Sequence, residues 1–129
     1  MEIYYSQLKK TIDAASIEEM SEIEFNGLVS ILLYDDKNTG CIAEYHAFPE
    51  HYEIYLWECV PIIFRKPMIL HEVAELTLNE LYPNQLMLNR HGHARKLDVK
   101  YAQERMKENE FQLYLKFIRE HEESIKNIN

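Results

Sequence analysis

Residues 67–82, PMILHEVAELTLNELY, carry the clearest helical pattern of the chain. Pro67 suits the first position of a helix, where its missing N–H needs no partner, and Pro83 predicts the end of the helix near Tyr82. The residues that recur at the spacing of one helical face are Leu70, Val73, Ala74, Thr77 and Leu81. We therefore expect a helix that buries this face in the protein core.

Three stretches before this helix have the apolar or alternating character of strands: 28–36, 41–48 and 52–60. The first two are separated by the turn residues of DKNTG, which predicts a β-hairpin. The third resumes the alternation after a break at Pro49, with Ile54 and Leu56 on one face. The simplest arrangement is a three-stranded antiparallel meander.

Helices are expected at both ends of the chain. Tyr4, Leu8 and Ile12 share one face of a short N-terminal helix, and the capping spacing of Ser16 and Glu19 predicts a second helical segment from Ile17. Residues 93–125 contain no Gly or Pro, which predicts one long helix with a kink near Asn109. The sequence thus predicts one α+β domain, 1–129, in which the two late helices pack on the sheet or on each other.

Composition excludes several classes of protein. The chain has 129 residues and a net charge of −8, whereas a protein that binds nucleic acid needs a basic stripe. No stretch has the length of a membrane span or the pattern of a signal peptide, so we expect a cytoplasmic protein that binds no membrane. Cys41 and Cys59 lack the spacing of a zinc ribbon or a disulfide framework and are expected to be buried in two strands.

His71 and Glu75 are four residues apart, so they point the same way from the edge of the core. Such a pair can offer an imidazole nitrogen and a carboxylate oxygen to one cation, about 2 Å from each, as in the zinc helix with the pattern HExxH. Glu72 has the position of the general base in those enzymes, beside the water that the ion activates. This pattern predicts a metal-binding helix with Glu72 as the catalytic residue.

A complete site needs at least one further ligand, and the late helix offers His93 and Glu104. His91 and Glu108 are alternatives, and the sequence does not decide among the four. A carboxylate in an otherwise apolar line costs free energy unless it is paired, protonated or bound to metal. Against this, Glu104 and Glu108 lie in a highly charged run that is also typical of a solvated helix face.

A resemblance becomes visible at these residues. A small sheet followed by ILHEVAEL and a second helix resembles the minimal zincin core, and small phage or mobile-element proteins with an HExxE helix are similar. The matching residues are His71, Glu72, Glu75, His91, His93, Ala94 and Glu104. The resemblance covers about half of the chain and implies a divalent metal, most simply zinc, and a metal-dependent peptidase or amidohydrolase. Glu75 replaces the second histidine of the HExxH pattern, which leaves enzymatic activity uncertain.

Two other functions remain open. The chain can be a non-enzymatic acidic protein of phage or mobile-element origin. Its acidic face would then bind a basic surface of a host protein and inhibit that protein. It can also be a zincin-like fold that has lost its chemistry. The two apolar stripes of the late helix predict a homodimer, since a helix that is apolar on two sides has partners on two sides. No residue pattern identifies a substrate or a host partner.

Overall fold

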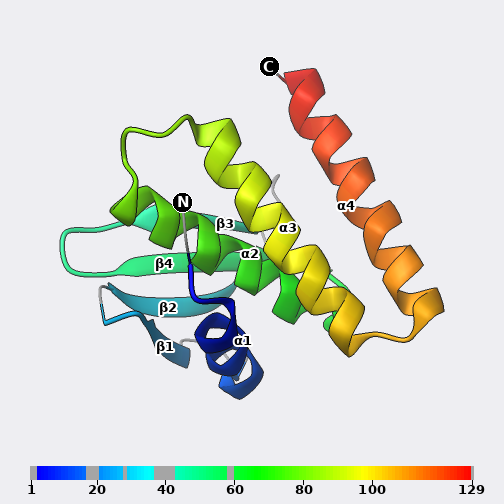
Figure 1. The fold of residues 1–129 in the computed structure, drawn as a ribbon, viewed down its shortest axis with the longest axis horizontal. Helices are drawn as coiled ribbons and strands as arrows, with labels where there is room; N and C mark the ends of the chain where they lie inside the picture. Colours follow the sequence, from blue (N-terminus) through cyan, green and yellow to red (C-terminus); the bar gives the residue numbers. More distant parts are fainter. Residues whose placement is uncertain (1–2, 17–20, 28, 37–42, 58–59, 129) are drawn as a thin grey trace.

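The computed structural model describes residues 3–16, 21–27, 29–36, 43–57 and 60–128. Figure 1 shows an α+β fold in which helices cover a four-stranded sheet, so the predicted fold class is confirmed. The elements in chain order are α1 (Tyr5–Ala14), β1 (Ser21–Phe25), β2 (Val29–Asp36), β3 (Ala43–Ala47), β4 (Tyr52–Trp57), α2 (Ile62–Leu81), α3 (Met87–Arg105) and α4 (Glu108–Ile128).

The sheet is mixed, and the predicted antiparallel meander is wrong. The strand order is β1-β2-β4-β3, in which β4 pairs in parallel with β2 and antiparallel with β3. β1, the strand missing from the sequence prediction, pairs antiparallel with β2. Alternation of apolar residues determines which face of a strand is buried, but it does not determine the neighbouring strand. The expected hairpin between β2 and β3 therefore does not form, because β4 lies between them.

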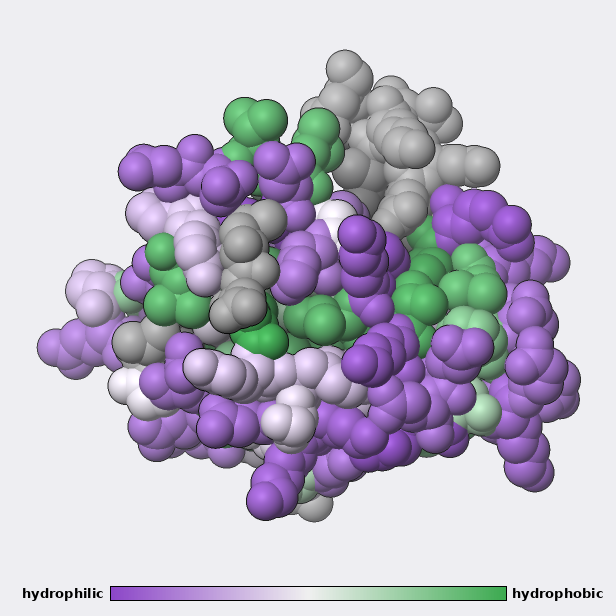
Figure 2. Space-filling model, in the orientation of Figure 1, coloured by the Kyte–Doolittle hydropathy of each residue, from purple (hydrophilic) through white to green (hydrophobic). Residues whose placement is uncertain are grey.

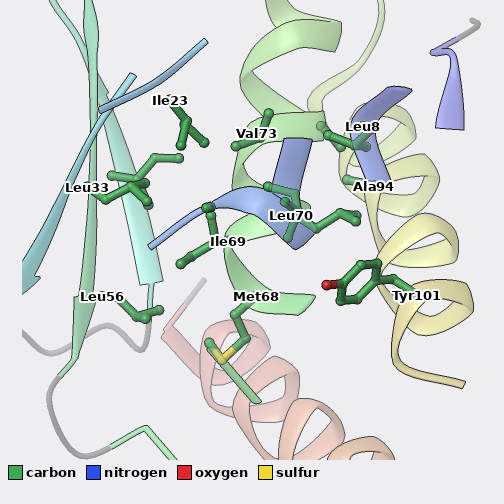
Figure 3. Packing of buried hydrophobic residues seen from close by; sticks show 14 of the residues in the cluster. Leu8, Ile23, Leu33, Leu56, Met68, Ile69, Leu70, Val73, Ala94 and Tyr101 are labelled. Atoms are coloured by element: carbon green, nitrogen blue, oxygen red, sulfur yellow. The ribbon is translucent and has the colours of Figure 1, made fainter. Parts of the chain in front are cut away.

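One face of the sheet packs on α2. Leu33 of β2 and Leu56 of β4 are buried, and Figure 3 shows them directed toward Ile69 on α2. On the other side of α2, Figure 3 shows Leu70 near Leu8 of α1 and Tyr101 of α3. α2 thus occupies the middle of the molecule, between the sheet on one side and α1 and α3 on the other.

This central position explains why α2 is buried over much more than the predicted face. His71, Glu72 and Leu78 are all buried, although only Leu78 is apolar, while Leu81 at the end of the helix is exposed. The helix ends near Tyr82 as expected. Its start was predicted too late: α2 begins at Ile62, and Pro67 lies inside the helix.

The N-terminal helix α1 is confirmed, with Leu8 and Ile12 buried. The second helical segment expected from Ile17 does not continue as predicted, because Ser21–Phe25 is a strand. Ile23 and Phe25 are buried in that strand while Glu22 and Glu24 are exposed, so the alternation has the period of a strand. The expectations for Cys41 and Cys59 lie outside the described residues.

The expected long helix is two helices, α3 and α4. Met106 adopts an extended backbone, with φ −101° and ψ 152°, which ends α3 before the predicted kink at Asn109. The Lys107 N–H donates a hydrogen bond of 3.0 Å to the Glu110 carboxylate, which caps the start of α4. This break lets α4 turn back along α3 (Figure 1), and Tyr114 and Phe117 of α4 pack against Phe64 near the start of α2.

The surface seen in Figure 2 is mostly hydrophilic, with a few separate hydrophobic patches. Leu86, Met87 and Leu88, at the start of α3, are among the exposed apolar residues. None of the described helices has both the length and the apolar composition needed to cross a membrane.

Candidate metal centre

A buried carboxylate orients the imidazole of His71. The Nδ1 atom of His71 lies 2.7 Å from Oδ2 of Asp98 on α3, whose side chain has no exposed surface. The same oxygen accepts a hydrogen bond of 2.7 Å from Arg95, and the Tyr114 hydroxyl of α4 donates one of 2.8 Å to Oδ1. These contacts hold Asp98 and therefore fix the orientation of the His71 ring, which leaves Nε2 available to face Glu75.

Glu75 and His91 complete a compact group of possible ligands. The Nε2 atom of His71 lies 2.9 Å from Oε2 of Glu75, and Nδ1 of His91 lies 3.5 Å from the same oxygen. The two imidazole rings meet edge to face, with their centroids 4.8 Å apart. Each of the three residues offers one ligand atom, and these atoms lie within 4.8 Å of one another. Within the described part of the chain, this is the group that could hold a metal ion.

The group lies in the wall of a cavity of about 250 Å³. Glu72 also lines this cavity, and only 9% of its surface is exposed. Among the described residues we find no hydrogen bond or ion pair to the Glu72 carboxyl. Phe117 and Ile118 of α4 also line the cavity. The cavity therefore places an unpaired acid next to the candidate ligands, in a partly apolar space.

The pKa values of Glu72 and Glu75 are shifted in opposite directions. Burial raises the pKa of Glu72 to about 8. Burial acts in the same direction on Glu75, but hydrogen bonds from His71 and His91 outweigh it and lower the pKa of Glu75 to about 2. Burial alone would lower the pKa of His71, yet the hydrogen bonds to Asp98 and Glu75 raise it to about 9. Burial thus favours the protonated form of Glu72, whereas the hydrogen bonds favour the ionised form of Glu75.

The structure separates the predicted ligands into two groups. His71, Glu72 and Glu75 lie together, as the helical spacing predicts. His91, one of the alternatives left open, joins them, whereas His93 is not part of the group.

Glu104, another candidate for the further ligand, is not part of the group around His71. Its carboxylate accepts hydrogen bonds from the Tyr5 hydroxyl, at 2.9 Å, and from Lys9, both on α1. Glu108, on α4, accepts a hydrogen bond of 2.9 Å from Gln112 one turn along the same helix. Both glutamates are thus exposed surface residues, which agrees with the solvated reading of this charged run.

Asp98 and Tyr114 were not among the predicted site residues. The buried face of α3 is formed by Ala94, Asp98, Tyr101 and Ala102, so an aspartate replaces an apolar residue at a core position. An acid in such a position needs a partner, which is the signal that could have identified Asp98. The ring of Tyr114 is buried in the core, and its hydroxyl donates a hydrogen bond to Asp98.

Comparisons with protein-family models, with curated proteins and with solved structures found no match to this chain. The chemistry of the site therefore has to be inferred from its own residues. Two imidazoles and a carboxylate form a donor set that catalytic zinc sites use, with one position left for water or substrate.

Proposed function

We propose that the chain is a zincin-like metal protein in which His71, Glu75 and His91 hold one divalent ion, most simply zinc. The observation that carries this proposal is the convergence of their three ligand atoms within 4.8 Å in the wall of a cavity. Asp98 supports it, because a histidine that binds metal commonly donates its other N–H to a carboxylate. The resemblance of ILHEVAEL to the zincin helix also supports this proposal.

Two of the three separations between the donor atoms are close to those expected around a small ion. Bonds of about 2.0–2.1 Å in tetrahedral geometry place two ligand atoms roughly 3.4 Å apart. The separations of 2.9 Å between His71 and Glu75 and 3.5 Å between His91 and Glu75 lie on either side of this value. The glutamate at position 75, in place of the second histidine of HExxH, is compatible with this metal site. The helix supplies one histidine and one glutamate, and His91 restores the set of two histidines and one carboxylate.

A bound divalent ion would supply Lewis-acid activation of water and of a substrate carbonyl. Glu72 is the residue to accept the proton of that water, because it lines the cavity and has no hydrogen-bond or ion-pair partner among the described residues. Its buried position favours the neutral acid that would then pass the proton to a leaving amine. We therefore propose a hydrolase acting on a peptide or amide bond, with Glu72 as general base and acid.

The same residues would also form a stable cluster without any ion. A protonated His71 can bridge Asp98 and Glu75 as a buried ion-pair network, which corresponds to a zincin-like fold without chemistry. The two alternatives differ in a measurable way. The ion-pair network gives no metal-dependent stability, whereas a metal site stabilises the folded chain in proportion to the concentration of free ion.

The test combines thermal unfolding with hydrolysis of a labelled substrate. Protein freed of metal with a chelator is titrated with zinc and then incubated with fluorescein-labelled casein. The proposal predicts a rise in the unfolding temperature with zinc for both wild type and Glu72→Gln, and hydrolysis for wild type alone. A rise in the unfolding temperature without hydrolysis would support the metal site and contradict casein as a substrate. No rise in either protein would contradict the metal site itself.

A further inference from the structure

The face of the sheet that points away from α2 carries two rows of acidic and aromatic residues. In the first row, Glu22 on β1 is opposite Leu32 on β2, which is opposite Glu53 on β4. In the second row, Tyr34 on β2 is opposite Tyr55 on β4. We call the outward-facing residues of these strands the outer sheet face: Glu22, Glu24, Leu32, Tyr34, Glu44, His46, Glu53 and Tyr55.

Contacts between side chains join the part of the outer sheet face that lies on β2, β3 and β4. The rings of Tyr34 and Tyr55 stack with centroids 5.2 Å apart, and the ring of His46 meets Tyr55 edge to face at 5.2 Å. The Tyr55 hydroxyl donates a hydrogen bond of 2.5 Å to Glu53. His46 also lies 3.5 Å from the Glu44 carboxylate. Aromatic rings thus form the centre of the face, and carboxylates lie around them.

The face is accessible to a partner. Glu22, Glu24 and His46 are exposed, and the two tyrosine rings are half-buried by their neighbours on the sheet. The helices that pack on the strands do so from the opposite side, where Ile31 and Ile54 join the core.

Charge is distributed very unevenly along the chain. Residues 11–64 contain eleven Asp and Glu and a single Lys, a net charge of −10, although the whole chain carries only −8. None of the four strands contains a Lys or Arg. The negative charge of the protein therefore belongs to the part that forms the sheet, while the remaining, mainly helical, part is close to neutral.

From this arrangement we infer that the outer sheet face binds an arginine-rich segment of a partner protein. A guanidinium group stacks on the exposed face of a tyrosine ring, and its N–H groups reach carboxylates on either side. Stacked Tyr34 and Tyr55, with glutamates on the neighbouring strands, provide both parts of this interaction. A lysine segment would gain the charge attraction but less of the stacking, and the negative charge disfavours nucleic acid.

The inference is independent of the metal site and is tested in the presence of a chelator. The probe is a fluorescein-labelled peptide of alternating arginine and serine, compared with its lysine and glutamate counterparts by fluorescence anisotropy. The wild-type chain should bind the arginine peptide more tightly than the lysine peptide and should not bind the glutamate peptide. Increasing salt should weaken both interactions.

Matched variants separate a specific surface from a general effect of net charge. Glu22→Gln combined with Glu24→Gln should weaken binding of the arginine peptide about 5-fold, since each exposed ion pair contributes modestly. Glu108→Gln combined with Glu120→Gln on α4 makes the same change in net charge and should leave binding within about 2-fold. Tyr34→Leu should weaken binding of the arginine peptide about 3-fold and of the lysine peptide less.

Mapping on the wild-type protein avoids any dependence on how the variants fold. Amide chemical-shift changes caused by the arginine peptide should concentrate in residues 22–34 and 44–55. Equal losses in both pairs of glutamate variants, or shift changes located on α3 and α4, would overturn the inference. Self-association of the chain through this face, seen by sedimentation with no binding of the peptide, would also overturn it.

Discussion

The Nδ1 atom of His71 lies 2.7 Å from Oδ2 of Asp98, and this pair joins the two helices that supply the candidate ligands. His71 belongs to α2, whereas Asp98 is on α3, two turns after His91. Tyr114 brings α4 to the same carboxylate. The geometry of the proposed metal centre therefore depends on the packing of three helices, and it can be tested at residues that would not touch the ion.

Asp98→Asn should weaken zinc binding about 10- to 100-fold, which is the usual cost of losing the partner of a metal-binding histidine. The amide can still accept a hydrogen bond from His71, but it no longer carries the charge that makes the imidazole a better donor. The measurement is a competition titration with a chromophoric chelator. Unchanged zinc affinity would show that Asp98 serves the fold and does not support a metal site.

Tyr114→Phe is the matched control for Asp98→Asn. It removes one hydrogen bond to Asp98 and leaves the carboxylate in place, so it should lower the free energy of unfolding by about 1 kcal/mol. Zinc affinity should remain within about 3-fold of wild type, because the partner of His71 is retained. A loss as large as that of Asp98→Asn would mean that the packing of α4, and not the Asp98 charge, determines zinc affinity.

The metal-free protein should lose stability as the pH rises from about 5 to about 8.5. Burial raises the pKa of Glu72 from its ordinary 4.5 to about 8, so its contribution is complete below 4.5 and is lost as the pH rises through 8. The raised pKa of His71, about 9 compared with 6.5, acts in the same direction above pH 6.5. The lowered pKa of Glu75 contributes stability above 4.5 that is lost only toward pH 2. Urea unfolding in the presence of chelator measures the trend.

Glu72→Gln tests which group dominates this pH dependence. A neutral amide cannot ionise in the buried site, so at about pH 8.5 the variant should be more stable than wild type by at least about 1 kcal/mol. At about pH 5, where Glu72 is protonated in the folded chain, the two proteins should have similar stability. A variant that is less stable than wild type at the higher pH would contradict the buried, unpaired state of Glu72.

Glu104→Gln should leave zinc affinity unchanged. This side chain is bound to Tyr5 and Lys9 of α1 and is not part of the candidate ligand group, so only stability should respond. Because the ion pair with Lys9 is partly exposed, the loss should be below about 1 kcal/mol. Reduced zinc content in this variant would instead support Glu104 as a metal ligand.

Leu70→Ala should destabilise the chain by about 3 kcal/mol, since Leu70 is fully buried between α2, α1 and α3. Leu113→Ala on α4 removes the same atoms from an exposed position and should change stability by less than about 0.5 kcal/mol. Chemical denaturation of both variants measures the difference. Similar losses would contradict the central position of α2.

The fold class and most strands could be predicted from the sequence because alternation of apolar residues is a local property. Ile54 and Leu56 are buried, as their spacing indicates. The order of the strands depends on which edges meet in the folded chain, and no local pattern in β2 or β3 excludes β4 from the place between them. The break at Met106 was missed for a similar reason, since neither Gly nor Pro is present to mark it.

The candidate site was predicted only where a single helix positions its residues. His71, Glu72 and Glu75 lie on α2, and their relation follows from the helical repeat. Predicting the site residues on α3 would require knowing which face of that helix packs on α2. The small side chains of Ala94 and Ala102 mark that face, which turns Asp98 inward and Glu104 outward. The sequence alone does not identify this face, so Glu104 stayed among the candidates for the further ligand.

The measurement that tests the metal centre most directly is the zinc content per chain of untagged protein, for wild type, His91→Ala and His93→Ala. The two variants lose the same imidazole two residues apart on α3, but only His91 lies beside His71 and Glu75. We predict one ion per chain in wild type and in His93→Ala, and a loss of most of it in His91→Ala. No zinc in any of the three proteins, or equal zinc in all three, would contradict a centre formed by His71, Glu75 and His91.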